Sequence, residues 1–111
     1  AIKALQRPGR PDVFGRILSR YVESSHEVVE TIRRAVQSHD AVALHAAAHR
    51  LKSSSAQLGA LALADDCRQL EMMGASRELE QARNVLNELE QHYVDTCAAI
   101  REELLQWRPA A

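Results

Sequence analysis

Residues 46–59 read AAAHRLKSSSAQLG, a stretch that combines an apolar stripe with a histidine and a closing glycine. At about 100° per residue of an α-helix, one side of residues 44–58 collects apolar side chains opposite His49, namely Leu44, Ala47, Leu51 and Leu58. Gly59 suits the left-handed position just past a helix end, which a residue with a Cβ occupies only at a cost. The stretch therefore predicts an amphipathic helix that ends at Leu58, buries its apolar stripe and turns His49 outward.

The chain on both sides of this stretch contains few helix breakers, with three prolines and four glycines in all. Between the breakers, apolar residues recur at three- and four-residue steps, the pattern of helices that each bury one face. We expect helices at about 11–37, 40–58, 61–73 and 76–107, and a short one at about 1–7. Because short connections make neighbouring helices antiparallel, the sequence predicts an all-α, up-down antiparallel four-helix bundle, with the short N-terminal helix covering one end.

Capping residues and breakers define the expected helix ends. Ser38 or Asp40 can cap the helix that follows by accepting a backbone N–H. Residues 74–76, Gly-Ala-Ser, are expected to break the third helix, which carries Leu63, Cys67 and Leu70 on one side. The last long helix would then start near residue 76.

Length and charge restrict the class of protein. A chain of 111 residues, 46% of them apolar, forms one domain whose core needs no metal or disulfide. A net charge of −1 argues against a nucleic-acid partner, and no apolar run approaches the roughly 20 residues that cross a bilayer. Cys67 and Cys97 have no CxxC spacing, which fits buried thiols in a reducing compartment. We expect a monomeric, cytoplasmic module without direct membrane contact.

The predicted outward face around His49 carries the most chemistry. It includes His45, Lys52, Ser53 and Ala56. A neutral imidazole offers a nucleophilic nitrogen near pH 7 and forms a labile N–P bond. Lys52, one turn away, could offset the charge of a phosphoryl group, and the small side chains beyond His49 would admit another protein closely. These residue types suit a phosphoryl carrier, although a solvated helix face can also combine a histidine with a lysine.

The motif HRLKSSSAQLGA at residues 49–60, followed by Leu63, Cys67 and Leu70-Glu71, resembles the histidine phosphotransfer (HPt) domain of multistep two-component phosphorelays. The resemblance covers roughly residues 11–105 in helix length and order. It implies that His49 is the phosphoacceptor and Lys52 its electrostatic companion. It also implies a phosphocarrier that is not an enzyme and binds no cofactor. This carrier would take a phosphoryl group from one receiver-domain aspartate and pass it to another, with Mg²⁺ held by the receiver.

Two motif positions leave alternatives open. The family commonly has Gly directly after the motif lysine, where this chain has Ser53, whose hydroxyl could bond a carbonyl one turn back or contact the phosphoryl group. The family often places a polar side chain against the histidine ring at the position of Glu71. A carboxylate there would accept Nδ1–H and leave Nε2 as the nucleophile, or Glu71 could form an ordinary surface ion pair. The resemblance implies partner contacts at His45, Ser53, Ala56 and Gln57.

Other interpretations fit the residues less well. A metal site at His45 and His49 lacks the glutamate of an HExxH motif and a third ligand, so we expect no metal and place His45 at the rim of the phosphoryl site. The serines at 53–55 lack a nucleophile elbow. A kinase dimerisation helix would carry an acidic residue where Arg50 stands.

A non-catalytic helical adaptor remains the alternative function. His26, His39 and His92 are interpreted as surface or boundary residues, and Met72 and Met73 as core or loop packing.

The first residue is Ala1 and not Met, which favours a module cut from a hybrid sensor histidine kinase whose parent could lie in the inner membrane.

Overall fold

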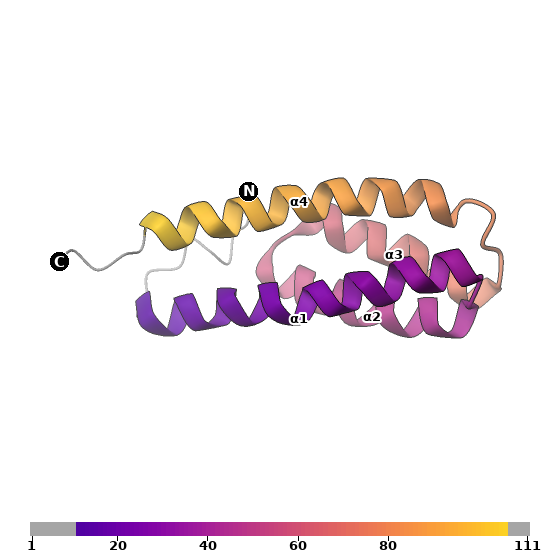
Figure 1. Ribbon diagram of the computed structural model, residues 1–111, viewed down its shortest axis with the longest axis horizontal. Helices are drawn as coiled ribbons and strands as arrows, with labels where there is room; N and C mark the ends of the chain where they lie inside the picture. The colour runs from indigo at the N-terminus through magenta and orange to yellow at the C-terminus, as the bar shows by residue number, and fades with distance from the viewer. Residues whose placement is uncertain (1–10, 107–111) are drawn as a thin grey trace.

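The computed structural model describes residues 11–106, which form four α-helices (Figure 1). Helix α1 spans Pro11–Ser38, α2 spans Ala41–Leu58, α3 spans Leu61–Ser76 and α4 spans Ala82–Gln106. Successive helices run in opposite directions along one long axis (Figure 1). The predicted all-α, up-down four-helix bundle is therefore confirmed, whereas the short helix expected at about 1–7 lies outside the described residues.

The ends of α2 follow local capping chemistry. The side chain of Asp40 accepts a hydrogen bond from the backbone N–H of Ala43 at 3.0 Å, so Asp40 and not Ser38 is the N-cap. At the other end Gly59 is left-handed with φ 89°, and the N–H of Ala60 donates to the carbonyl of Ser55 at 2.9 Å. These contacts satisfy backbone groups that every helix end leaves unpaired.

The expected break at residues 74–76 is wrong, because α3 continues through Gly74 to Ser76. Gly74 is buried, and a Cβ built on it would lie only 2.7 Å from the carbonyl oxygen of Ala41. The glycine thus allows α3 to approach α2 closely. Helix α3 ends instead at Ser76, because the next residue, Arg77, is left-handed with φ 60°.

The last helix begins at Ala82, not near residue 76 as expected. Once the left-handed Arg77 has ended α3, the chain needs residues 78–81 to reach the start of α4. Leu79 in this connection packs, partly buried, against the core. The connection is therefore part of the packed structure and not an extension of the helix.

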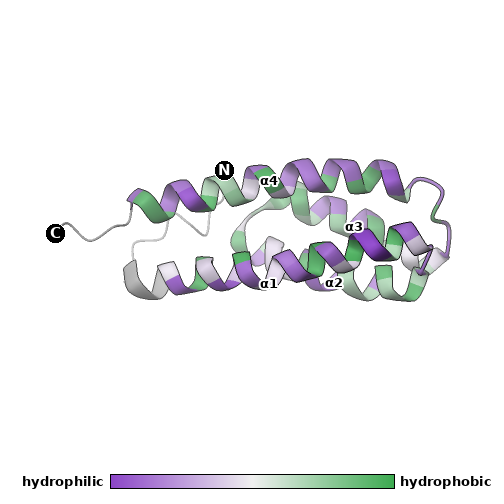
Figure 2. Cartoon of the chain, in the orientation of Figure 1, coloured by the Kyte–Doolittle hydropathy of each residue, from purple (hydrophilic) through white to green (hydrophobic). Residues whose placement is uncertain are grey.

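Among the residues that the structure describes, the core consists of two clusters. All four helices contribute to the larger one, whose fully buried members include Ile32, Leu44, Leu51, Leu63, Leu70 and Leu89. The smaller cluster is formed by Leu18, Tyr21, Leu58 and Ile100. Hydrophilic and hydrophobic residues are interspersed along each ribbon (Figure 2), as expected where each helix buries one stripe. Burying a large aliphatic side chain contributes about 1.5–3 kcal/mol.

The predicted inward stripe of α2 is confirmed, since its four apolar residues are all buried: Leu44, Ala47, Leu51 and Leu58. The packing of this stripe turns the opposite side of the helix, with His49, to solvent. Within residues 11–106, no helix is both long and apolar enough to span a membrane.

Candidate functional site

The outward face of α2 carries the predicted site residues. The His49 side chain is 58% exposed, and His45, Ser53, Ala56 and Gln57 are also exposed. Lys52 lies at the edge of this face with 32% of its side chain exposed, and Glu71 reaches it from α3 with 14% exposed. Two neighbouring helices, α2 and α3, therefore bring His49, Lys52 and Glu71 together.

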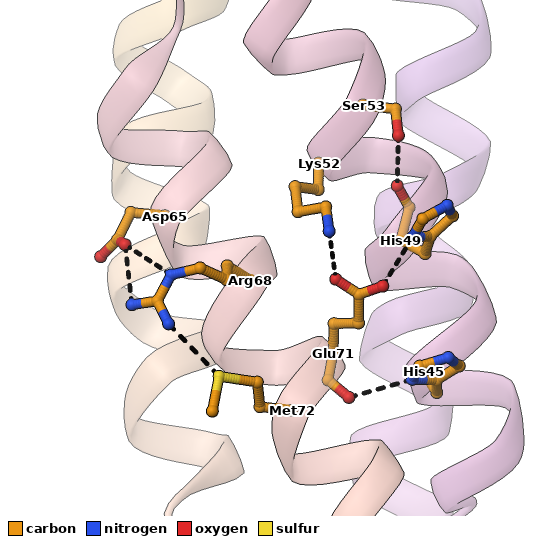
Figure 3. A network of polar contacts seen from close by, with 8 residues as sticks. All are labelled: His45, His49, Lys52, Ser53, Asp65, Arg68, Glu71 and Met72. Atoms are coloured by element: carbon orange, nitrogen blue, oxygen red, sulfur yellow. Dashed lines mark hydrogen bonds and ion pairs between the residues drawn. The ribbon is translucent and has the colours of Figure 1, made fainter.

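One carboxylate joins the histidine to the lysine (Figure 3). Oε2 of Glu71 lies 2.5 Å from Nδ1 of His49, and Oε1 of Glu71 accepts a hydrogen bond from Nζ of Lys52 at 2.6 Å. His49 and Lys52 lie three residues apart on α2, so their side chains point to the same side. Glu71 is thus bound on both oxygens.

The contact with Glu71 determines which nitrogen of His49 carries the proton. An ionised carboxylate only accepts hydrogen bonds, so Nδ1–H of the neutral ring donates to it. Nε2 then keeps its lone pair, and this nitrogen points away from Glu71 (Figure 3). The arrangement presents a nucleophilic nitrogen on an exposed ring whose orientation is held from behind.

Charge keeps Glu71 in its accepting form. The hydrogen bond from Lys52 is the largest influence and lowers the pKa of Glu71. Partial burial opposes it, and the hydrogen bond from His49 lowers the pKa further. The carboxyl is therefore ionised at neutral pH. In this structure the ammonium of Lys52 is already paired with Glu71. The sequence had suggested only that this charge is available to an added phosphoryl group.

His45 and Ser53 lie one turn before and one turn after His49. Nδ1–H of His45 donates to the backbone carbonyl of Glu71 at 3.1 Å, which ties the same residue of α3 to α2 a second time. The hydroxyl of Ser53 donates to the carbonyl of His49 at 3.1 Å. Of the two contacts considered for Ser53, the structure shows the one to the backbone.

A second histidine–carboxylate pair was missed by the sequence analysis. Nδ1 of His92 on α4 lies 2.5 Å from Oδ2 of Asp66 on α3, and Asp66 is buried. Burial raises the pKa of Asp66, and the hydrogen bond to Asp66 raises the pKa of His92. The available signal was the spacing of Asp66, which lies three residues after Leu63 and four before Leu70 and so on the buried stripe of α3.

The structure also bears on the two alternatives of a catalytic serine and a metal site. Ser55 is fully buried and shares a hydrogen bond of 2.9 Å with the hydroxyl of Tyr21, so it is part of the core. Across the described part of the chain, no three His, Cys, Asp or Glu side chains are grouped so that they could hold a metal ion.

Comparison with known proteins agrees with this architecture. The sequence matches the family model described as Hpt domain over residues 16–108, and the chain belongs to this family of histidine-containing phosphotransfer domains. It is a phosphotransfer intermediate of two-component phosphorelays. Domains of this class interact with the receiver domains of response regulators.

A particular solved structure is similar over most of both chains. It is the crystal structure of histidine-containing phosphotransfer protein B (HptB) from Pseudomonas aeruginosa PAO1. The TM-score is 0.84 at 29% sequence identity, covering 87% of this chain and 84% of that chain. Among curated proteins the sequence has no significant match.

Proposed function

We propose that this domain carries the phosphoryl group on Nε2 of His49, between the aspartates of two receiver domains. The observation that supports the assignment most strongly is the 2.5 Å contact between Nδ1 of His49 and Oε2 of Glu71 on a ring that is 58% exposed. An adaptor surface would need no such orientation of a histidine.

The transfer needs no proton to leave the ring. The lone pair of Nε2 attacks phosphorus, the N–P bond forms, and the P–O bond to the receiver aspartate breaks with its electron pair returning to that carboxylate. The phosphorylated ring keeps its proton on Nδ1 and becomes positively charged, and the carboxylate of Glu71 stabilises this charge. Passage to the second receiver is the same step in reverse, with its aspartate as the nucleophile.

Lys52 contributes a second, movable charge. Its ammonium carries three donors on a flexible stem, so it can bind the phosphoryl oxygens while it stays near Glu71. This domain supplies the oriented nucleophile and no catalysis of its own, and the receiver supplies the acidic pocket and Mg²⁺. No cofactor of this chain enters the step.

The receiver docks on the exposed side of α2 around His49. Ser53 and Ala56 are small and exposed, so a partner can approach the ring closely, and His45 and Gln57 frame this surface. Such an exchange partner needs only a small, transient interface. The large exposed apolar side chains of the described residues are spread over all four helices, which supports a monomer. We assign the module to the cytoplasm, where it would exchange phosphoryl groups with receiver domains.

The test is phosphoryl transfer from a phosphorylated receiver with Mg²⁺ to wild type and to His49→Gln. We expect an acid-labile, base-stable adduct on wild type and none on His49→Gln. The melting temperature of the variant should stay within about 2 °C of wild type, because an exposed side chain contributes little to stability. His26→Gln, at an exposed histidine of α1, should accept phosphoryl as wild type does. Labelling that survives His49→Gln would show that another residue is the acceptor.

A further inference from the structure

Gly74 brings α3 into backbone contact with α2. A Cβ at this position would lie 2.7 Å from the carbonyl oxygen of Ala41, 2.7 Å from the backbone nitrogen of His45 and 2.9 Å from its Cβ. Side-chain tips can rotate away from such an overlap, but backbone atoms within a helix cannot. The separation of the two helices at this point therefore depends on the missing side chain.

This contact lies one turn from the phosphotransfer site on both helices. Gly74 follows Glu71 by three residues on α3, and His45 precedes His49 by four residues on α2. At the same level, Nδ1–H of His45 donates to the backbone carbonyl of Glu71 at 3.1 Å (Figure 3). The tight turn at Gly59 joins the helices at their other ends. The site is thus held between two places where the helices are joined.

We propose that Gly74 and His45 are positioning residues for phosphotransfer. Their contacts set the spacing of α2 and α3 at which the carboxylate of Glu71 reaches Nδ1 of His49. The inference rests on the proposed role of His49 as the phosphoacceptor. Gly74 acts by letting the backbones touch, and His45 acts by fixing the backbone of Glu71 along α2.

A methyl group at position 74 would force the helices apart. Ordinary contacts of a Cβ are 3.4–4 Å, whereas the backbone atoms of Ala41 and His45 lie at 2.7 Å, so α3 must move outward. The carbonyl of Glu71 moves with the helix, and its hydrogen bond to His45 lengthens. The carboxylate then withdraws from His49, whose ring becomes free to rotate and to adopt the tautomer with the proton on Nε2. In that tautomer the outward nitrogen is no longer a nucleophile.

The chain offers a matched control for this substitution. Gly15 is also a helical glycine, in α1, but among the described residues a Cβ built on it meets only Cδ2 of Leu104, at 3.8 Å. Gly74→Ala and Gly15→Ala gain the same intrinsic helix propensity. Only the first places a methyl group against the backbone of another helix.

The experiment compares the two variants with wild type by two readouts. The ¹⁵N shifts of the His49 ring, recorded without any receiver, report its tautomer, and transfer from a phosphorylated receiver reports the rate. For Gly74→Ala we expect ring signals that move from the Nδ1–H form toward a mixture of tautomers. We also expect roughly tenfold slower transfer, since a displacement of about 1 Å in a reacting group has effects of this size or larger. Gly15→Ala should match wild type in both.

The ring signals test the spacing whether or not a receiver is found. Absence of transfer to wild type would count against His49 as the acceptor, while a changed tautomer in Gly74→Ala would still support the positioning role. A folded Gly74→Ala with wild-type ring signals and rate would overturn the proposal. If Gly74→Ala does not fold, His45→Ala removes the second contact without adding bulk. In this variant the signals of the His49 ring should move in the same direction as in Gly74→Ala, and unchanged signals would overturn the proposal.

Discussion

At the residue scale, the site depends on Glu71, because its two oxygens bind two different side chains of α2. The contact with His49 selects the tautomer, and the contact with Lys52 keeps the carboxyl ionised. In the proposed mechanism the same carboxylate also neutralises the positive charge that a phosphorylated ring would acquire. Geometry and charge therefore act through one side chain and can be separated by substitution.

Replacing Glu71 by Gln separates the orienting hydrogen bond of this side chain from its negative charge. The amide keeps a carbonyl oxygen for Nδ1–H of His49 but removes the negative charge. Charge-assisted hydrogen bonds are roughly twice as strong as neutral ones, and about 1.4 kcal/mol corresponds to a tenfold change in rate. We therefore expect Glu71→Gln to accept phosphoryl roughly tenfold more slowly in single-turnover transfer.

Asp65→Asn is the control for this charge effect. Asp65 is an exposed carboxylate on the same helix, bound to Arg68 and Gln69 and not to the site. Its variant should transfer at the wild-type rate. Equal rates for Glu71→Gln and Asp65→Asn would show that the charge of Glu71 is not used.

At the scale of single elements, α3 ends in a conformation that its sequence does not favour. Arg77 is left-handed with φ 60°, which costs a residue with a Cβ about 1 kcal/mol or more. Glycine avoids this cost but loses more conformational entropy on folding. We expect Arg77→Gly to raise the free energy of unfolding by about 0.5 kcal/mol and the melting temperature by about 2–4 °C. Ser76→Gly, one residue earlier in the helix, should lower both, and a lower melting temperature for Arg77→Gly would contradict the argument.

The pairing of α3 with α4 through Asp66 and His92 makes stability depend on pH. The pKa of His92 is raised above its ordinary value of 6.5 by the hydrogen bond to Asp66. A histidine whose pKa is raised on folding stabilises the fold fully below about pH 6.5, and this contribution is lost as the pH rises through the folded-state value.

We expect His92→Ala to lower the free energy of unfolding by about 1–3 kcal/mol near pH 6.5, because Asp66 is then buried without its partner. The difference from wild type should be smaller at pH 9. Denaturant titrations of both proteins at the two pH values measure this difference in the free energy of unfolding. For His26→Ala the difference from wild type should not depend on pH. A difference that stays constant or grows toward pH 9 would contradict the pairing as the cause.

At the scale of the whole molecule, α1 and α4 extend together beyond the ends of α2 and α3 (Figure 1). The extension is held by the smaller cluster, in which Leu18 and Tyr21 pack with Ile100 and with Leu58 from the end of α2. The site lies on the other part, where all four helices share the larger cluster. The part that carries His49 is therefore the better packed one.

This division predicts unequal opening of the bundle. Regions with few buried apolar contacts open with a lower free energy than the main core. We expect backbone amides at residues 18–22 and 98–104 to exchange hydrogen at least tenfold faster than those at 44–51 and 63–70. Native-state hydrogen exchange measures this, and uniform protection over both regions would show that the bundle opens only as one unit.

Several features of the fold and site followed from sequence because their causes are local. Helical periodicity, a helix cap at Ser38 or Asp40 and the left-handed Gly59 depend on neighbours within a few residues. The outward direction of His49 follows from the same periodicity. The nearness of Lys52 follows from a spacing of one turn.

The tertiary structure alone decided what depends on distances between helices. Glu71 lies 22 residues from His49 in sequence, and only the resemblance suggested their contact, with a surface ion pair as the alternative. Gly74 lowers helix propensity wherever it stands, so the sequence indicated a break where the structure has a close contact. The contact between Asp66 and His92, 26 residues apart, likewise depends on how α3 packs against α4. By itself the sequence determined which side of each helix is buried, and the packing of α3 against its neighbours determined which polar groups meet.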